Sequence, residues 1–237
     1  MDESLRSRLD KYAADCVAIL EPRLRAVILY GDATSSANAP ITTALLLDEV
    51  SMPTVRKVRE IAEKWRRSMV APLLLDDEYL CTSCDVFPLE LLALRDNHEV
   101  IWGEAEPVRT LVLHREHLRL EVEEQLKGKI LHLRQAYIEA RGSGRVLRDL
   151  LLQSSVGFEI VMRGLLYLDG REHPQDPAEV VRQVQLAADM ALPAFECIQD
   201  ARLHGTTIRP ADAEALFERY HDELVALARA TNRVTRG

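Results

Sequence analysis

A small polar loop that follows a short apolar run carries the residues with the clearest chemical potential in this sequence. The run Arg25–Tyr30 is apolar and β-branched and stops at Gly31, and the segment from Gly31 to Pro40 (GDATSSANAP) is small and polar throughout. The Asp32 carboxylate in this loop is able to bind a cation or a ribose hydroxyl. The alternative is a structural role, because Asp suits turns by bonding to its own backbone.

A second polar set lies on a long helix expected further along the chain. Glu123, Lys127 and Arg134 follow one another at spacings of four and seven residues, which places them on one stripe of a helix. Ordinary pairing of Glu123 with Lys127 on a solvated surface accounts for the same spacing. The stripe is therefore a candidate site whose alternative is a plain helix surface.

The cysteines do not form a complete metal-binding pattern. Cys81 and Cys84 make a lone C-x-x-C, whereas a structural zinc site needs a second pair of ligands. The nearest candidate pair is His114-x-x-His117, about thirty residues further on. We therefore expect reduced thiols and no metal.

Composition limits the class of protein. A formal net charge of −8 over 237 residues argues against a broad basic surface that binds the phosphates of a nucleic acid. The N-terminus is acidic where a signal peptide would be basic, and Gln153, Glu159 and Arg163 interrupt the most apolar stretch. These features predict a cytoplasmic protein that binds neither extended nucleic acid nor a membrane.

The first hundred residues alternate between helical and extended patterns. Apolar residues at helical spacing predict amphipathic helices, and short apolar runs bounded by polar turns predict strands. The expected helices are 3–21 and 51–67, and the expected strands are 25–30, 41–47, 70–75, 91–94 and 99–102.

After Gly103 the pattern becomes purely helical. We expect helices at 115–140, 145–168, 178–191, 193–203 and 210–232. The segment 145–168 is apolar almost all round, so it should occupy the centre of a bundle. The sequence thus predicts an α+β protein with two domains, a mixed sheet with helices over residues 1–108 and an all-α helical bundle over 109–237.

This order of elements resembles the polymerase-β-like nucleotidyltransferase superfamily, and in particular a bacterial branch with a degenerate active-site motif. Ile28–Asp32 matches the first strand and its glycine, and the stretches Pro88–Gly103 and His117–Glu139 match further along the chain. The resemblance implies a nucleotidyltransferase-like fold whose helical domain covers a cleft. It also implies that the loop at Thr34 and Ser35 can receive a phosphate through backbone N–H groups, which the acidic Asp32 would oppose.

The resemblance also implies that the metal site is lost. In that superfamily a serine follows the glycine, and two aspartates on the second strand hold two metal ions about 4 Å apart. Here Asp32 replaces the serine, and Thr43 and Leu45, eleven and thirteen residues further on, stand where the aspartates belong.

A third carboxylate is also uncertain in this sequence. The resemblance places it on a later strand, where Ala93 stands. Glu90 or Asp85 would fit in a different register.

The sequence therefore predicts a nucleotidyltransferase-like protein that has lost metal-dependent transfer and binds a ligand or a partner without a cofactor. The first alternative is an active aminoglycoside- or protein-modifying transferase that uses Asp32 and Glu90 with magnesium and a nucleotide. The second is a protein-interaction module that acts through the bundle. The expected partners are a small molecule or nucleotide and a second copy of the chain. The candidate ligand-binding residues are Gly31, Asp32, Thr34, Ser35, Glu123, Lys127 and Arg134.

Overall fold

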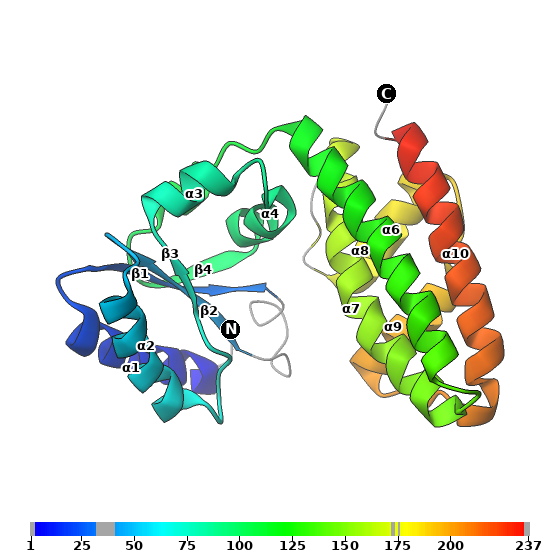
Figure 1. Cartoon of the computed structure of the whole chain (residues 1–237), viewed down its shortest axis with the longest axis horizontal. Helices are drawn as coiled ribbons and strands as arrows, with labels where there is room; N and C mark the ends of the chain where they lie inside the picture. The colour runs from blue at the N-terminus through cyan, green and yellow to red at the C-terminus, as the bar shows by residue number, and fades with distance from the viewer. Residues whose placement is uncertain (1–2, 32–40, 172–173, 175, 235–237) are drawn as a thin grey trace. The chain divides into compact units, whose positions relative to one another are not determined.

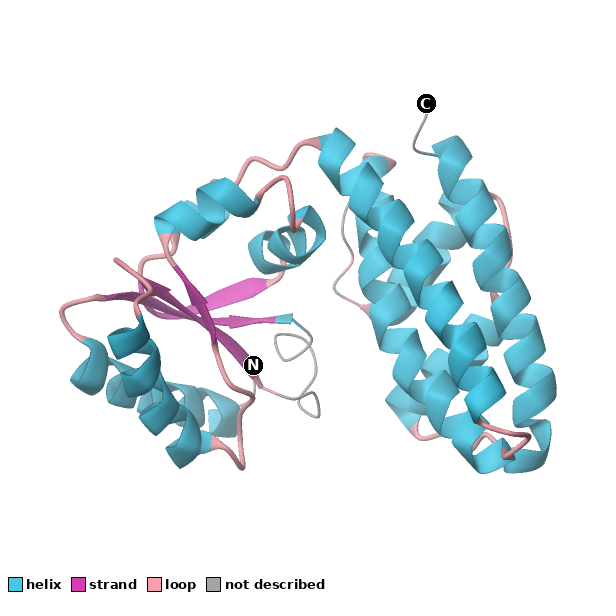
Figure 2. Ribbon diagram, in the orientation of Figure 1, coloured by secondary structure: helices cyan, strands magenta, loops and turns pink. Residues whose placement is uncertain are grey.

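A computed structural model describes residues 3–31, 41–171, 174 and 176–234, with the side chains of residues 232–234 outside the description. The chain divides into two compact units, Met1–His114 and Arg115–Gly237. The short helix α5 (Glu106–Arg109), which spans the domain boundary expected from the sequence, belongs to the first unit. All the described strands lie in the first unit, and the second is helical (Figure 2).

The first unit is a small mixed sheet with helices on both faces (Figure 1). Its strands are β1 (Leu24–Tyr30), β2 (Thr42–Leu47), β3 (Leu73–Leu75) and β4 (His98–Gly103), arranged in the order β3-β2-β1-β4. The central strand β1 pairs antiparallel with both β2 and β4, whereas β2 pairs parallel with β3. Its helices are α1 (Glu3–Leu20), α2 (Met52–Trp65), α3 (Asp77–Ser83), α4 (Pro88–Asp96) and α5.

Helices α1 and α2 close one face of the sheet because each presents an apolar stripe to it. Leu9 and Cys16 of α1 are fully buried against Leu29 and Leu45 of the strands. Tyr12 of α1 meets Trp65 of α2 edge to face, with ring centroids 5.6 Å apart. This packing fixes which side chains of β1 and β2 face the interior.

One expected strand is a helix. Residues 91–94 lie in α4 and not in a strand, since Pro88 occupies the first turn and Glu90 follows it there. A proline at the start and an acid in the first turn both favour a helix. The expected strand at 70–75 is shorter, with only Leu73–Leu75 in β3, and the strand expected at 99–102 is confirmed as β4.

The described part of the second unit is a bundle around one central helix. Helix α7 (Gly144–Leu168) contacts each of its four neighbours, as its apolar character predicted. The neighbours are α6 (Arg115–Glu139), α8 (Pro177–Ala188), α9 (Pro193–His204) and α10 (Ala213–Val234), with a 3-10 turn at Pro210–Asp212. Prolines begin α8 and α9, where the missing N–H costs no hydrogen bond.

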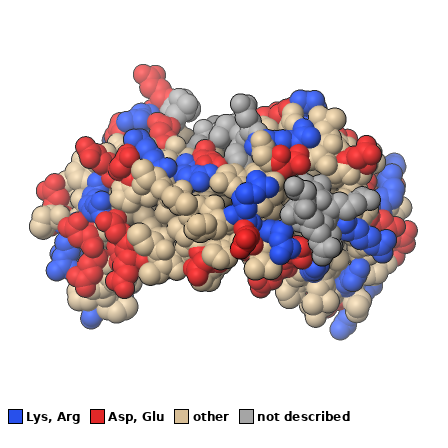
Figure 3. Space-filling model, turned by 90° about the horizontal axis from the view of Figure 1, so that it is seen from above, with Lys and Arg blue, Asp and Glu red and all other residues tan. Residues whose placement is uncertain are grey.

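Throughout the part of the chain that the structure describes, no helix combines the length and apolarity needed to cross a bilayer. Lys and Arg lie among Asp and Glu over the face drawn in Figure 3.

Candidate functional site

Of the described strands only β4 carries a carboxylate, that of Glu99, which forms an ion pair with Arg6 of α1 at 3.1 Å. The sequences of β1, β2 and β3 are LRAVILY, TTALLL and LLL. This conclusion does not depend on the register of the comparison, because no residue on either face of β2 is acidic. Among the described residues, no group of three or more His, Cys, Asp or Glu side chains is placed to hold a metal ion.

Thr43 and Leu45 belong to the interior of the first unit. Thr43 is 1% exposed and its hydroxyl donates a hydrogen bond to the Tyr12 hydroxyl at 3.3 Å. Leu45 is fully buried in the apolar layer beneath α1. Burial raises the pKa of Tyr12 far above its ordinary value, so this phenol stays neutral. These positions stabilise the fold and have no access to a ligand.

The three positions considered for a third carboxylate do not lie on a strand. Ala93 and Glu90 are on α4, where Glu90 is exposed, and Asp85 lies between α3 and α4. The expectation that Ala93 stands on a strand is therefore wrong. Asp32, the proposed partner of Glu90, lies outside the described residues, as do Thr34 and Ser35.

Gly31 is the one loop candidate that the structure describes. Its φ of +73° is a backbone conformation that glycine adopts without strain. Its N–H donates to the carbonyl oxygen of Asn97 at 3.1 Å, and the Asn97 amide donates back to the Gly31 carbonyl oxygen at 3.3 Å. The glycine thus fixes the end of β1 beside the start of β4.

The polar residues expected on α6 bond within the second unit. Glu123 accepts from Arg119 at 2.9 Å and from Lys127 at 3.1 Å. The hydrogen bond from Lys127 is the main cause that lowers the pKa of Glu123, so this carboxylate is a weak base. Arg134 donates from Nε to His221 of α10 at 2.9 Å. These contacts fit the alternative of a plain helix surface with ordinary pairing.

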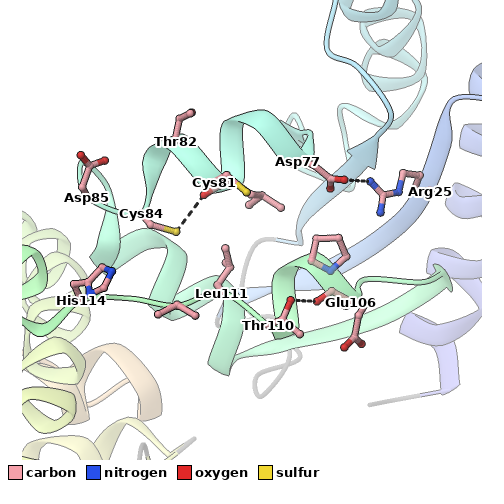
Figure 4. Close-up of a pocket in the computed structure, with 13 residues that line it drawn as sticks. Arg25, Asp77, Cys81, Thr82, Cys84, Asp85, Glu106, Thr110, Leu111 and His114 are labelled. Carbon is pink, nitrogen blue, oxygen red and sulfur yellow. Dashed lines mark hydrogen bonds and ion pairs between the residues drawn. The ribbon is translucent and has the colours of Figure 1, made fainter.

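A cavity of about 990 Å³ in the first unit brings together polar groups that the sequence does not link (Figure 4). Its walls come from the start of β1, from α3, from α5 and from the segment that follows α5. The lining residues are Arg25, Asp77, Leu80, Cys81, Thr82, Cys84, Asp85, Glu106, Pro107, Thr110, Leu111, Val112 and His114.

The charge of this cavity is negative. Arg25 forms an ion pair with Asp77 at 2.7 Å, which neutralises both groups. Asp85 and Glu106 contribute two further carboxylates, and Figure 4 shows them on different walls of the cavity. Counting its Arg, Asp and Glu side chains, one cation against three carboxylates, the lining carries a formal net charge of about −2.

The Cys84 thiol of the cavity is not activated. It donates a hydrogen bond to the Leu80 carbonyl oxygen at 3.1 Å, and Cys81 is exposed one turn earlier. Burial raises the pKa of the Cys84 thiol, and Cys81 and Asp85 raise it further. A protonated thiol is a poor nucleophile, so Cys84 does not suit a covalent role.

Sequence reasoning missed this cavity as a site. It considered Cys81 and Cys84 only as metal ligands, and it assigned no element to the segment around them. A usable signal was Asp76 followed by two acids, which is typical of a helix start. The Asp76 side chain does cap α3, accepting from the Tyr79 N–H at 2.8 Å.

Comparisons with known proteins do not assign the chain to a family. A scan against models of protein families gives no match, and neither does a search of curated protein sequences.

Proposed function

We propose that this chain is a binding protein on a nucleotidyltransferase-like scaffold and that it does not carry out metal-dependent nucleotidyl transfer. The observation that carries the proposal is the absence of any carboxylate on β1, β2 and β3. Two-metal transfer requires acidic ligands on adjacent strands. Strands whose only charged side chain is that of Arg25 cannot supply them.

The arrangement of the strands supports the scaffold part of the proposal. A helix connects the parallel strands β2 and β3, and β1 pairs antiparallel with β2 on the other side. A helical unit follows the sheet unit, which is the order that the resemblance implies.

The cavity of the first unit is the ligand site in this proposal. Its volume of about 990 Å³ lies at the upper end of the usual range for small-molecule sites. The carboxylates of Glu106 and Asp85 would repel a nucleoside triphosphate and attract a protonated amine. The ligand class that fits this charge is a small organic cation, which the acidic walls would hold beside apolar groups such as Leu111 and Val112.

Isothermal titration calorimetry with spermidine tests this assignment directly. We expect Glu106→Gln to weaken spermidine binding about fivefold, because one carboxylate is worth about 1 kcal/mol at a partly solvated site. Glu104→Gln is the matched control, since Glu104 is exposed close by in the sequence and does not line the cavity. Equal affinities in the two variants, or no spermidine binding at all, would contradict the ligand site.

A second titration tests the loss of catalysis independently. ATP and GTP with magnesium should show no saturable binding, and incubation with an aminoglycoside acceptor should yield no nucleotidylated product. Magnesium-dependent nucleotide binding or detectable transfer would overturn the proposal, whatever the outcome with spermidine.

A further inference from the structure

Helix α6 carries a second apolar stripe that the bundle does not cover. Leu120, Leu131 and Ile138 are 57%, 55% and 74% exposed. Leu120 and Ile138 are 18 residues apart, which is five full turns of an α-helix, and Leu131 is only about 20° off the same line. The three side chains therefore form one outward row about 27 Å long.

The row points away from the interior of the second unit. The core face of α6 presents Val122, Leu126 and Leu133, each at most 3% exposed. Lys129 reaches Gly157 of α7, with its Nζ about 3.1 Å from where a Cβ of that glycine would stand. Helix α6 is thus apolar on two sides, of which the bundle uses one.

The outward row is complementary to itself when a second α6 lies antiparallel across it. The twofold axis crosses the outer face of α6 at the level of residue 129. Residues that are equally far from position 129, one before it and one after it, then meet across the two copies. Leu120 and Ile138, each nine residues from the axis, then meet across the two copies. Apolar side chains at both ends of the row would face apolar partners.

The charges on either side of the row match under the same operation. Glu124 and Arg134 are each five residues from the axis, so Glu124 faces the partner's Arg134 twice in the dimer. Lys127 and Leu131 are each two residues away, which lays the aliphatic stem of Lys127 on the partner's Leu131. No like charges are opposed at these positions.

We propose that the outer row of α6, formed by Leu120, Leu131 and Ile138, is an interface through which two copies of this chain associate antiparallel. The proposal is independent of the ligand site in the first unit. Helix α6 has 25 residues, and one pair of helices this long buries less than about 800 Å² per partner. The dimer is therefore a weak one, with a dissociation constant in the micromolar range.

Sedimentation velocity over a concentration series tests whether the row is an interface. The unaltered chain should shift from monomer to dimer across the micromolar range. Leu131→Lys should raise the dissociation constant at least about tenfold, because it places a cation against the partner's Lys127. Leu186→Lys on α8 is the matched control, since Leu186 is also 57% exposed and lies off the row. A strict monomer, or equal effects of the two variants, overturns the proposal.

Charge exchange tests the antiparallel register. Glu124→Arg and Arg134→Glu should each weaken self-association, because each opposes like charges twice. A mixture of the two variants should associate at least as well as the unaltered chain, since every contact then pairs opposite charges. Self-association that is unaffected by Glu124→Arg, or a mixture of folded variants that does not recover, overturns this register. Circular dichroism verifies folding, because Arg134 also bonds to His221.

Discussion

The two units differ in whether their interior contains a buried carboxylate. In the bundle, Glu159 of α7 is 3% exposed and accepts from Arg163 at 3.3 Å and from Arg202 of α9 at 2.7 Å. In the sheet, the corresponding interior is apolar apart from hydroxyls such as that of Thr43. The second unit thus holds a buried carboxylate at its centre, whereas the one carboxylate on the described strands of the first, that of Glu99 on β4, belongs to a side chain that is 40% exposed and forms an ion pair with Arg6.

The difference shows what a buried carboxylate requires in this protein. Desolvation of an ion costs several kcal/mol, and two guanidinium groups offset that cost at Glu159. Among the described residues no Lys or Arg is buried between α1 and the sheet, so an acid at Thr43 or Leu45 would need a bound metal. The strands offer a buried acid no compensation of the kind that Glu159 has.

Restoring one acid to the sheet is the most severe test of this difference. Leu45→Asp should lower the free energy of unfolding by about 4 kcal/mol or more, because it removes a packed side chain and buries an unpaired charge. Urea unfolding measures the loss, and Leu45→Asn separates the charge from the lost packing. Stabilisation of the Asp variant by millimolar magnesium would show that a metal site survives.

Removing the acid from the bundle should have the next largest effect. Glu159→Gln should cost about 3 kcal/mol, since it leaves Arg163 and Arg202 close together without their counter-charge. Thermal unfolding measures the change, with Glu139→Gln on the exposed surface of α6 as control. An effect below that of the control would mean that the pairing adds little to stability.

Asp15 offers a smaller, pH-dependent test in the first unit. It accepts from Lys64 at 2.8 Å and from the Trp65 indole at 2.8 Å, and the Lys64 bond is the main cause that lowers its pKa below the ordinary 3.8. Asp15→Asn should cost about 1 kcal/mol at pH 7. A lowered pKa contributes stability above pH 3.8 that disappears as the pH falls through the folded-state value. The stabilities of the two proteins should therefore begin to approach each other near pH 3.8 and become equal only below the folded-state pKa of Asp15.

Thr43→Val should have the smallest effect of the four. The variant loses one long hydrogen bond to Tyr12, whose hydroxyl also interacts with Cys16. We expect a change of about 0.5 kcal/mol in the free energy of unfolding, measured in urea. A loss as large as that of Leu45→Asp would show that the Thr43 hydroxyl has a further role.

Patterns within one element were sufficient to predict most of the fold. The all-round apolar character of α7 predicted its central place, and Pro177 and Pro193 marked the starts of α8 and α9. The segment 91–94 was predicted wrongly because a short apolar run fits a strand and a helix equally well.

The candidate site depends on contacts that no local pattern contains. Arg25 and Asp77, which pair across one wall of the cavity, are 52 residues apart in the chain. Sequence periodicity identifies apolar residues on one side of a helix, but it does not show which of them the bundle buries and which it leaves exposed on α6. Leu120 and Leu126 are alike in sequence and differ only in what the folded bundle places over them.

The order of the strands in the sheet also has a consequence for biosynthesis. The partners of β1 on β2 follow it by 12 to 23 residues, but Tyr30 also pairs with His98, which is 68 residues further on. At about 5–20 residues per second, translation leaves that edge of β1 unpaired for roughly 3–14 s. The second unit also closes late, because its last helix, α10, contacts α6 and α7 from much earlier in the chain. During synthesis the unpaired apolar edge of β1 is a surface open to aggregation, which a chaperone would shield.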